Sequence, residues 1–255
     1  MNTAHFAARL RAGQPLLSSF IKTPSHAVVE IAGDAGLDAV VLDAEHAPFD
    51  QGSLDRGLLA CRAASVSGLV RVADSRPATL LQALDLGADG LVLPHIVHAD
   101  QARDILRATR YRDGHRGFSN SPRAGGYGRA TLAEHLSAED GRHAIVAQIE
   151  DREALEHLDA IAAVGQIDCL LVGRVDLAVS LGAERLDDPR VEAATSQVID
   201  AAARAGKASG LFVAGLDDLD RFAARGVSFF ILGSDQALLR AGWSQQARHF
   251  RDSAR

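Results

Sequence analysis

Cysteine is scarce in this chain of 255 residues, in which Cys61 and Cys169 are the only two. Both lie in apolar stretches far apart in the sequence, which is typical of reduced core residues rather than of a disulfide framework. No apolar run approaches the roughly 20 residues that a membrane helix needs. The N-terminal segment also lacks the apolar centre of a secretory signal. We therefore expect a soluble, cytoplasmic protein that does not act on a membrane.

Lysine is equally scarce, and the chain carries a negative net charge. Lys22 and Lys207 are the only lysines, the net charge is −6 and the isoelectric point is near 5.9. A chain without a basic field is poorly suited to hold nucleic acid. The shortage also leaves a single candidate for Schiff-base chemistry, because only Lys22 directly follows an apolar segment that reads as a strand.

Short apolar segments alternate with amphipathic stretches along the whole chain, and this pattern predicts parallel strands joined by helices. We expect eight strands, at residues 16–21, 39–42, 68–72, 90–93, 144–149, 169–172, 209–213 and 228–232. Eight such units predict an α/β protein, with residues 1–255 forming a single (β/α)8 TIM barrel. An open doubly wound sheet is the alternative, but no Gly-x-Gly-x-x-Gly turn follows the first strand.

Two carboxylates follow neighbouring strands of this predicted barrel. Glu150 ends an apolar strand, and Asp176 lies a few residues beyond the next one. The carboxyl ends of barrel strands meet at one face, so both side chains could reach one hard cation such as Mg²⁺ or Mn²⁺. The alternative for each residue is an acid that stabilises the first turn of the following helix. Their equivalent places on adjacent strands favour the metal site.

His46 and Arg71 occupy similar places after earlier strands. Asp43 lies three residues before His46, and Glu45 lies directly before it, so a carboxylate could orient the imidazole for proton transfer. Arg71 lies inside an apolar strand, where an unpaired charge is costly. It is either half of a buried ion pair with Asp43 or Glu45, or a fixed positive charge that faces an oxyanion.

Three weaker signals accompany this set. His95 follows the fourth strand and is expected only to line a pocket, and residues 232–235 could bind phosphate through backbone N–H groups. Residues 111–129 are too long and glycine-rich for a tight turn. That segment is either a mobile surface loop, or a lid or subunit contact whose arginines face an anionic substrate.

The residues singled out above resemble those of the metal-dependent pyruvate aldolases of the HpcH/HpaI type. The resemblance is carried by Leu-Asp-Ala-Glu-His-Ala-Pro at 42–48, Val-Arg-Val at 70–72, Gln-Ile-Glu at 148–150 and Gly-Arg-Val-Asp-Leu-Ala-Val-Ser-Leu-Gly at 173–182. It extends to Arg-Gly at 116–117, Arg-Ala at 123–124, Tyr-Gly at 127–128 and Leu-Gly-Ser-Asp at 232–235. These motifs cover nearly the whole chain in the expected order.

The resemblance implies an enzyme that cleaves 4-hydroxy-2-oxo acids to pyruvate and an aldehyde through a metal-stabilised enolate of pyruvate, or runs the reverse condensation. It implies that Glu150 and Asp176 hold a divalent ion (Mg²⁺, Mn²⁺ or Co²⁺), with no organic cofactor. His46, oriented by Asp43, would be the general base, and Arg71 would face the enolate oxygen. Family members are commonly oligomers, often hexamers, in which the last helix, here residues 237–250, packs on a neighbouring subunit.

The resemblance also implies where the small-molecule 2-oxo acid and aldehyde substrates bind. Gln148 would lie beside the keto acid, and backbone N–H groups around Gly173, Arg174, Val175 and Asp176 would take its carboxylate. The family usually has Gly-Pro where this chain has Gly173-Arg174. Arg174, or Arg123 of the long segment, could therefore favour an acidic aldehyde. We expect Phe212 and Val213 to form an apolar wall of the aldehyde pocket.

Three alternatives remain at the level of the sequence. A Schiff-base aldolase would use Lys22. A CoA-ester lyase of the related citrate-lyase-like group would share the metal carboxylates but would need a cleft for the pantetheine arm. A non-catalytic barrel that binds a keto acid or a metal would bind ligand without releasing aldehyde.

Overall fold

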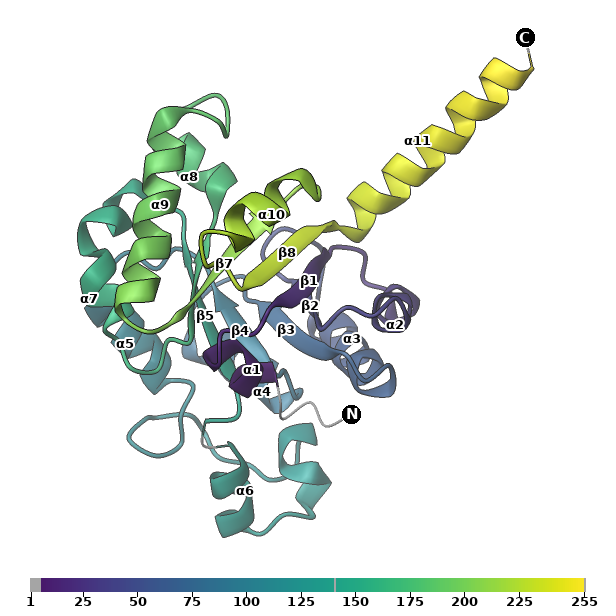
Figure 1. The fold of residues 1–255 in the computed structure, drawn as a ribbon. Helices are drawn as coiled ribbons and strands as arrows, with labels where there is room; N and C mark the ends of the chain where they lie inside the picture. Colours follow the sequence, from purple (N-terminus) through teal and green to yellow (C-terminus); the bar gives the residue numbers. More distant parts are fainter. Residues whose placement is uncertain (1–5, 140, 255) are drawn as a thin grey trace.

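The computed structural model describes residues 6–139 and 141–254. Its centre is a closed barrel in which each strand pairs in parallel with the next and β8 pairs with β1 (Figure 1). The strands are β1 (Leu16–Ile21), β2 (Ala39–Asp43), β3 (Ser67–Arg71), β4 (Gly90–Leu93), β5 (Ala144–Ile149), β6 (Cys169–Val172), β7 (Ala208–Val213) and β8 (Phe229–Ser234). The predicted eight-stranded (β/α)8 barrel is confirmed. Four strands have the predicted ends, and the others differ by one or two residues.

Helices join the strands on the outside of the barrel (Figure 1). The α-helices are α1 (Phe6–Arg11), α2 (His26–Asp34), α3 (Gln51–Ala63), α4 (Pro77–Asp85), α5 (Ala99–Arg107), α6 (Leu132–Glu139), α7 (Leu158–Ala162), α8 (Arg174–Ser180), α9 (Pro189–Arg204), α10 (Asp217–Ala223) and α11 (Asp235–Ser253). Two 3-10 helices, η2 (Arg123–Gly128) and η3 (Arg152–His157), lie in the links before α6 and α7. None of these helices is both long and apolar enough to cross a membrane.

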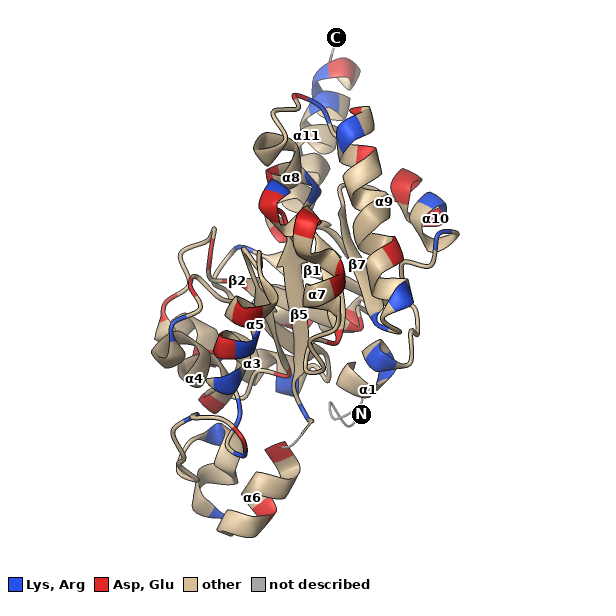
Figure 2. Cartoon of the chain, turned by 90° about the vertical axis from the view of Figure 1, so that its left-hand side faces the viewer, with Lys and Arg blue, Asp and Glu red and all other residues tan. Residues whose placement is uncertain are grey.

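Two apolar clusters hold the barrel together because the side chains of each strand point alternately inward and outward. Val41, Leu69 and Val146 belong to the cluster that fills the barrel interior. Their neighbours Val40 and Val70 belong to the cluster between the strands and the helices. Figure 2 shows the charged residues spread mainly over helices and loops, while β1 and β7 are tan along most of their length. Burial of both strand faces explains why these segments read as continuous apolar runs.

The long segment at 111–129 does not form a lid over this subunit's own strand ends. Arg123 binds the carboxylate of Asp55 and the main-chain oxygen of Leu86, both at 2.6 Å, and Leu86 leads into the start of β4. Arg116 is buried between Asp85 and Glu139, at 2.8 and 2.9 Å. The segment and α6 lie at the lower edge of Figure 1, while α8 and α10 lie in its upper half. The expectation that Arg123 meets the substrate within one subunit is therefore wrong.

Helix α11 leaves the barrel instead of covering it. The helix extends away from its start beside β8 (Figure 1). Its large apolar side chains are exposed, among them Leu238, Trp243 at 71% and Phe250 at 74%. In most βα units the helix buries its apolar face against the barrel. The apolar face of α11 is therefore without a partner in the described part of this chain.

Candidate active site

A cavity of about 290 Å³ opens at the carboxyl ends of the strands. It is lined by Phe20, Lys22, His46, Arg71, Gln148, Leu171, Val172, Gly173, Arg174, Val175, Asp176, Phe212 and Ser234. Predicted site residues from five different strand ends therefore meet in one space. This convergence is what a closed parallel barrel produces at the carboxyl ends of its strands.

Asp43 and Arg71 form a buried ion pair at the base of the site. They are register partners on β2 and β3, so their side chains start side by side. Arg71 donates from Nε and Nη2 to the two oxygens of Asp43, at 2.9 and 2.7 Å, and its Nε lies 3.3 Å from Glu45. The ring of Phe20 packs against the guanidinium at 4.5 Å. Burial alone would raise the pKa of Asp43, but the hydrogen bonds and positive charge of Arg71 lower it. Arg71 is therefore both a paired charge and a group that lines the cavity.

Lys22 is the second cation beside Asp43. Its ammonium lies 3.2 Å from the Asp43 carboxylate, and its main-chain N–H donates to Asp235 at 2.7 Å. Thr23 donates to the other oxygen of Asp235, at 3.1 Å, so the loop after β1 is held to the start of α11. From the sequence, Lys22 was predicted only as the lysine of a Schiff-base alternative. A Schiff base forms from a neutral amine, whereas the Lys22 side chain is engaged in an ion pair in this structure.

His46 lies at the cavity, but Asp43 does not hold its ring. The Asp43 carboxylate accepts from the main-chain N–H of His46 at 3.1 Å, and Glu45 is the nearest carboxylate to the imidazole, at 3.8 Å. The side chain of His46 is 53% exposed. The predicted orientation of the imidazole by Asp43 is therefore not formed in this structure. Asp43 instead fixes the turn that carries His46.

Glu150 is almost completely buried, with 2% of its surface exposed, at the end of β5. Its carboxylate accepts from the main-chain N–H of His95 at 3.0 Å and from the side-chain amide of Gln148. Burial raises the pKa of Glu150, and the negative charge of Asp176 adds to the effect, against these two hydrogen bonds. Gly173 leaves room for the carboxylate, because a Cβ there would lie 2.7 Å from a Glu150 oxygen.

The charges and acceptors of the site fit a divalent cation. The site and its surroundings contain four carboxylates (Asp43, Glu45, Glu150 and Asp176) but only two Lys or Arg side chains, Lys22 and Arg71, that pair with them. The side-chain oxygen of Gln148 is buried without a hydrogen-bond partner. No group of three or more His, Cys, Asp or Glu side chains that could hold a metal occurs among the described residues. An ion held by Glu150 and Asp176 would therefore need water or substrate oxygens, as Mg²⁺ usually does.

The guanidinium of Arg174 does not project into the mouth of the cavity. It binds Glu192 at 2.8 Å, Asp218 at 3.1 Å and the main-chain oxygen of Leu186 at 3.1 Å, and only 4% of the side chain is exposed. The guanidinium also lies over the ring of Phe222, at 5.0 Å. These contacts tie α8 to α9 and α10. The expectation that Arg174 offers a free cation to an acidic aldehyde is therefore wrong.

The apolar wall of the cavity also differs in part from the prediction. Phe212 lines the cavity and packs beside Phe20, with ring centres 5.9 Å apart. Val213 is buried in the layer between strands and helices instead. Neighbouring residues of a strand point to opposite faces, so the two could not share one wall. The same rule would have identified Phe20, because Phe20 and Lys22 are two positions apart at the end of β1.

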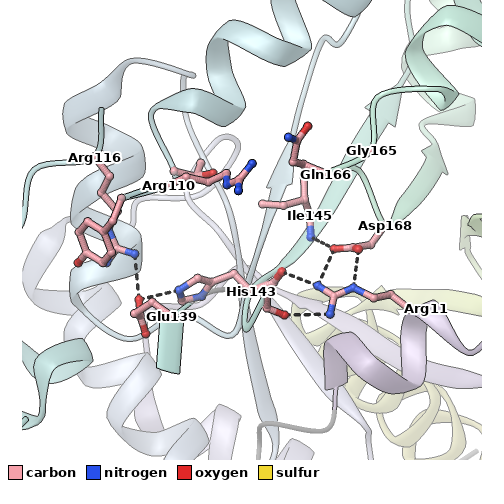
Figure 3. A pocket seen from close by; sticks show the side chains of 12 residues that line it. Arg11, Arg110, Arg116, Glu139, His143, Ile145, Gly165, Gln166 and Asp168 are labelled. Atoms are coloured by element: carbon pink, nitrogen blue, oxygen red, sulfur yellow. Dashed lines mark hydrogen bonds and ion pairs between the residues drawn. The ribbon is translucent and has the colours of Figure 1, made fainter. Parts of the chain in front are cut away.

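A second cavity, of about 300 Å³, lies at the opposite ends of β5 and β6. Figure 3 shows Arg11 beside Asp168, and Arg116 and His143 beside Glu139. Arg11 binds Asp168 at 2.7 Å, while Arg116 and His143 bind Glu139 at 2.9 and 2.8 Å. The carboxylates of this cavity already have cationic partners. We therefore assign the candidate active site to the cavity at the carboxyl ends of the strands, where predicted catalytic groups converge.

Comparison with known proteins identifies the family of the chain. The family model described as HpcH/HpaI aldolase/citrate lyase matches residues 17–241. The chain is 32% identical over 248 residues to the 5-keto-4-deoxy-D-glucarate aldolase of Shigella boydii serotype 18, which covers 96% of both chains. It is 34% identical over 238 residues to the hydroxypyruvate/pyruvate aldolase of Paraburkholderia phytofirmans, which covers 89% of this chain and 90% of the relative.

The same family appears among solved structures. An HpcH/HpaI aldolase/citrate lyase family protein from Burkholderia cenocepacia superposes with a TM-score of 0.93 and 30% identity, over 97% of this chain and 99% of that one. The match therefore includes the barrel and the elements that build its cavity. The chain belongs to the HpcH/HpaI aldolase/citrate lyase family and is a carbon–carbon lyase.

Proposed function

We propose that this enzyme is a divalent-metal-dependent aldolase that cleaves 4-hydroxy-2-oxo acids to pyruvate and an aldehyde. One observation carries the proposal: Arg71, Gln148 and Asp176 line one cavity. Behind them, Arg71 pairs with the buried Asp43, and Gln148 contacts the buried Glu150. Carboxylates left in excess of cations favour a bound divalent ion, and Arg71 supplies positive charge where an enolate oxygen would develop. Both features suit a reaction that passes through the enolate of pyruvate.

Each side chain has a distinct task in this proposal. Glu150 and Asp176 would hold the ion, which when bound would act as a Lewis acid on the 2-oxo group. His46, whose ring is half exposed at the cavity, would take the proton of the C4 hydroxyl directly or through a water. Loss of that proton drives cleavage of the C3–C4 bond, and the electron pair of that bond becomes the enolate. Arg71 would then face the enolate oxygen.

The substrate carboxylate would bind at the start of α8. The main-chain N–H groups of Arg174, Val175 and Asp176 have no acceptor among the described residues, because the first intrahelical bond is donated by Leu177 to Gly173, at 2.9 Å. Free N–H groups in a first helical turn are suited to a carboxylate. Gln148 lies in the same cavity and would contact the keto acid.

Two observations favour small acids over a CoA ester. The relatives named above act on a deoxy-keto-glucarate and on hydroxypyruvate or pyruvate, all of them small acids. A cavity of about 290 Å³ also lies at the small end of the range for ligand sites. We therefore place a CoA-ester lyase second and a non-catalytic binding barrel third.

A homo-oligomer is part of the proposal. The apolar face of α11 has no partner in the described part of this chain, and contiguous exposed apolar faces commonly mark a protein interface. A second copy of the chain would offer the same helix and the same barrel surface. The hexamer expected from the family resemblance remains a prediction.

The experiment is a panel of aldehydes incubated with pyruvate and Mg²⁺, Mn²⁺ or Co²⁺, with product measured by chromatography. Glu150→Gln should lower kcat/KM by on the order of 100-fold or more, because it removes a metal-binding charge. Glu153→Gln, an exposed acid three residues along the chain, is the matched control and should leave kcat/KM unchanged. Metal-independent turnover retained by Glu150→Gln would contradict the proposal.

The Schiff-base alternative needs a separate experiment, because Lys22 lines the cavity. Borohydride reduction in the presence of pyruvate traps a lysine imine as a stable mass increase. The ion pair with Asp43 predicts no such adduct at Lys22. An adduct at Lys22, together with activity that survives chelation, would establish the Schiff-base mechanism instead.

A further inference from the structure

His95 adopts an unusual backbone conformation at the rim of the site. Its φ is +54°, in the left-handed region that residues with a side chain rarely adopt. Ser65, Asp113 and Tyr127 share this feature among the described residues, but Ser65 lies between α3 and β3, and the other two lie between α5 and α6. His95 is two residues beyond the end of β4, at the carboxyl-end face. Such a conformation is strained and persists only where other contacts hold it.

The contacts of the His95 peptide units explain what the conformation achieves. The N–H of His95 donates to Glu150 at 3.0 Å, and its carbonyl accepts from the side chain of Gln101 at 2.9 Å. The next residue, Ile96, donates its N–H to the carbonyl of Gln148 at 3.3 Å. The turn is therefore held from α5 on one side and from β5 on the other. It delivers one N–H group to the buried carboxylate.

The ring of His95 fixes the same turn from outside the cavity. Its Nδ1 lies 3.0 Å from Asp151 and 3.6 Å from Glu150, and its Nε2 lies 3.7 Å from Glu45. The ring thus links the loop after β2 to the loop after β5. The side chain is 60% exposed and is not part of the cavity wall. His95 therefore touches Glu150 without touching the space that a substrate would fill.

We propose that His95 is a positioning residue that holds Glu150 in the orientation needed to bind the divalent ion. The inference rests on the proposed function, because it assigns Glu150 to the metal. The left-handed turn supplies the N–H that fixes one oxygen of Glu150, and the ring locks the turn by bridging Asp151 and Glu45. Residues that orient a metal-binding side chain typically contribute 10–100-fold to metal affinity.

Three substitutions separate the backbone from the ring. His95→Ala removes the ring and disfavours the left-handed conformation, so Mn²⁺ binding without substrate should weaken by about tenfold or more. His95→Asn keeps a residue that tolerates this conformation, and it should recover most of the lost affinity. His95→Gly permits the turn without any ring contact, and its affinity should fall between the other two.

The readout is the Mn²⁺ dissociation constant from calorimetry on the substrate-free protein, with the melting temperature and kcat and KM measured beside it. His98→Ala is the matched control, since His98 lies in the same loop and pairs with Glu153 instead, at 2.9 Å. Weaker Mn²⁺ binding in His95→Ala, partial rescue by His95→Asn and no change in His98→Ala would support the inference.

The failure of this inference differs from the failure of the proposed function. If the wild-type protein binds Mn²⁺ and all three His95 variants bind it equally well, His95 does not position Glu150 and only the inference is overturned. If His95→Asn binds Mn²⁺ no more tightly than His95→Ala, the left-handed turn does not determine the metal affinity, and the inference is overturned as well. If the wild-type protein binds no Mn²⁺ and still cleaves substrate, the metal-dependent function is overturned together with the inference.

Discussion

Gly173 leaves space for the Glu150 carboxylate because it has no side chain. A Cβ at this position would lie 2.7 Å from a Glu150 oxygen and 2.8 Å from the Glu150 Cβ, which is too close for either to remain in place. Its φ of −84° is open to any residue, so substitution would act through this contact and not through backbone strain.

Gly173→Ala should therefore displace the Glu150 carboxylate, weakening Mn²⁺ binding and lowering kcat/KM by at least about tenfold. Gly165→Ala is the control, because a Cβ there meets no atom within 4 Å. Calorimetry and steady-state kinetics on the two variants measure the effect. Equal metal affinity in both variants would mean that Glu150 is not a ligand or that it has room to move.

Single residues could be assigned to the site wherever chemistry and strand position agreed. His46, Arg71, Gln148 and Asp176 all line the cavity, as their places at strand ends suggested. The prediction went wrong where it required knowledge of long-range partners. Arg174 is an example, because its ion pairs are with Glu192 and Asp218, far along the chain. The contact of Asp43 with the His46 main chain, rather than with its ring, was equally invisible in the sequence.

At the scale of elements, the segment between α5 and β5 is held by a buried ionic cluster. Glu139, at the end of α6, binds Arg116, Arg142 and His143 at 2.8–3.0 Å. Burial alone would raise the pKa of Glu139, but the hydrogen bond from His143 and the charges of Arg142 and Arg116 lower it to about 2. The folded protein therefore binds this proton less readily than the unfolded chain does.

The ionised Glu139 stabilises the fold fully above its unfolded pKa near 4.5, and the contribution is lost as the pH falls towards 2. Glu139→Gln should consequently have a lower free energy of unfolding than wild type at pH 6. The difference between the two proteins should be about 2 kcal/mol smaller at pH 3. Urea unfolding at both pH values measures it. Glu184→Gln, an exposed acid for which the structure shows no ion pair, should give no such narrowing. If the difference in free energy of unfolding between wild type and Glu139→Gln is the same at both pH values, the ionised Glu139 does not stabilise the fold.

Elements could be predicted where their burial leaves a regular pattern in the sequence. The strands could be located closely because burial on both faces makes them continuous apolar runs, and β1, β4, β5 and β6 have the expected ends. The segment at 111–129 offers no such pattern. Its shape depends on the ion pairs of Arg116 and Arg123 with residues of three separate helices, which sequence spacing does not reveal.

At the scale of the whole molecule, α11 predicts self-association. Leu238, Trp243 and Phe250 are exposed on a helix that leaves its own barrel (Figure 1). Trp243→Glu should place a charge in the interface that we propose and should lower the mass measured by light scattering towards that of one chain. Ser244→Glu, at an exposed position of the same helix, adds the same single negative charge and is the control. A wild-type protein that is monomeric at micromolar concentration would contradict the proposed association.

The central claim is that carbon–carbon cleavage depends on a divalent ion held by Glu150 and Asp176. The most direct measurement is pyruvate release from a 4-hydroxy-2-oxo acid by protein stripped of metal, before and after Mn²⁺ or Mg²⁺ is added. We predict no release above background from the stripped protein and full recovery on addition of the ion. Undiminished cleavage by the metal-free protein would contradict the claim.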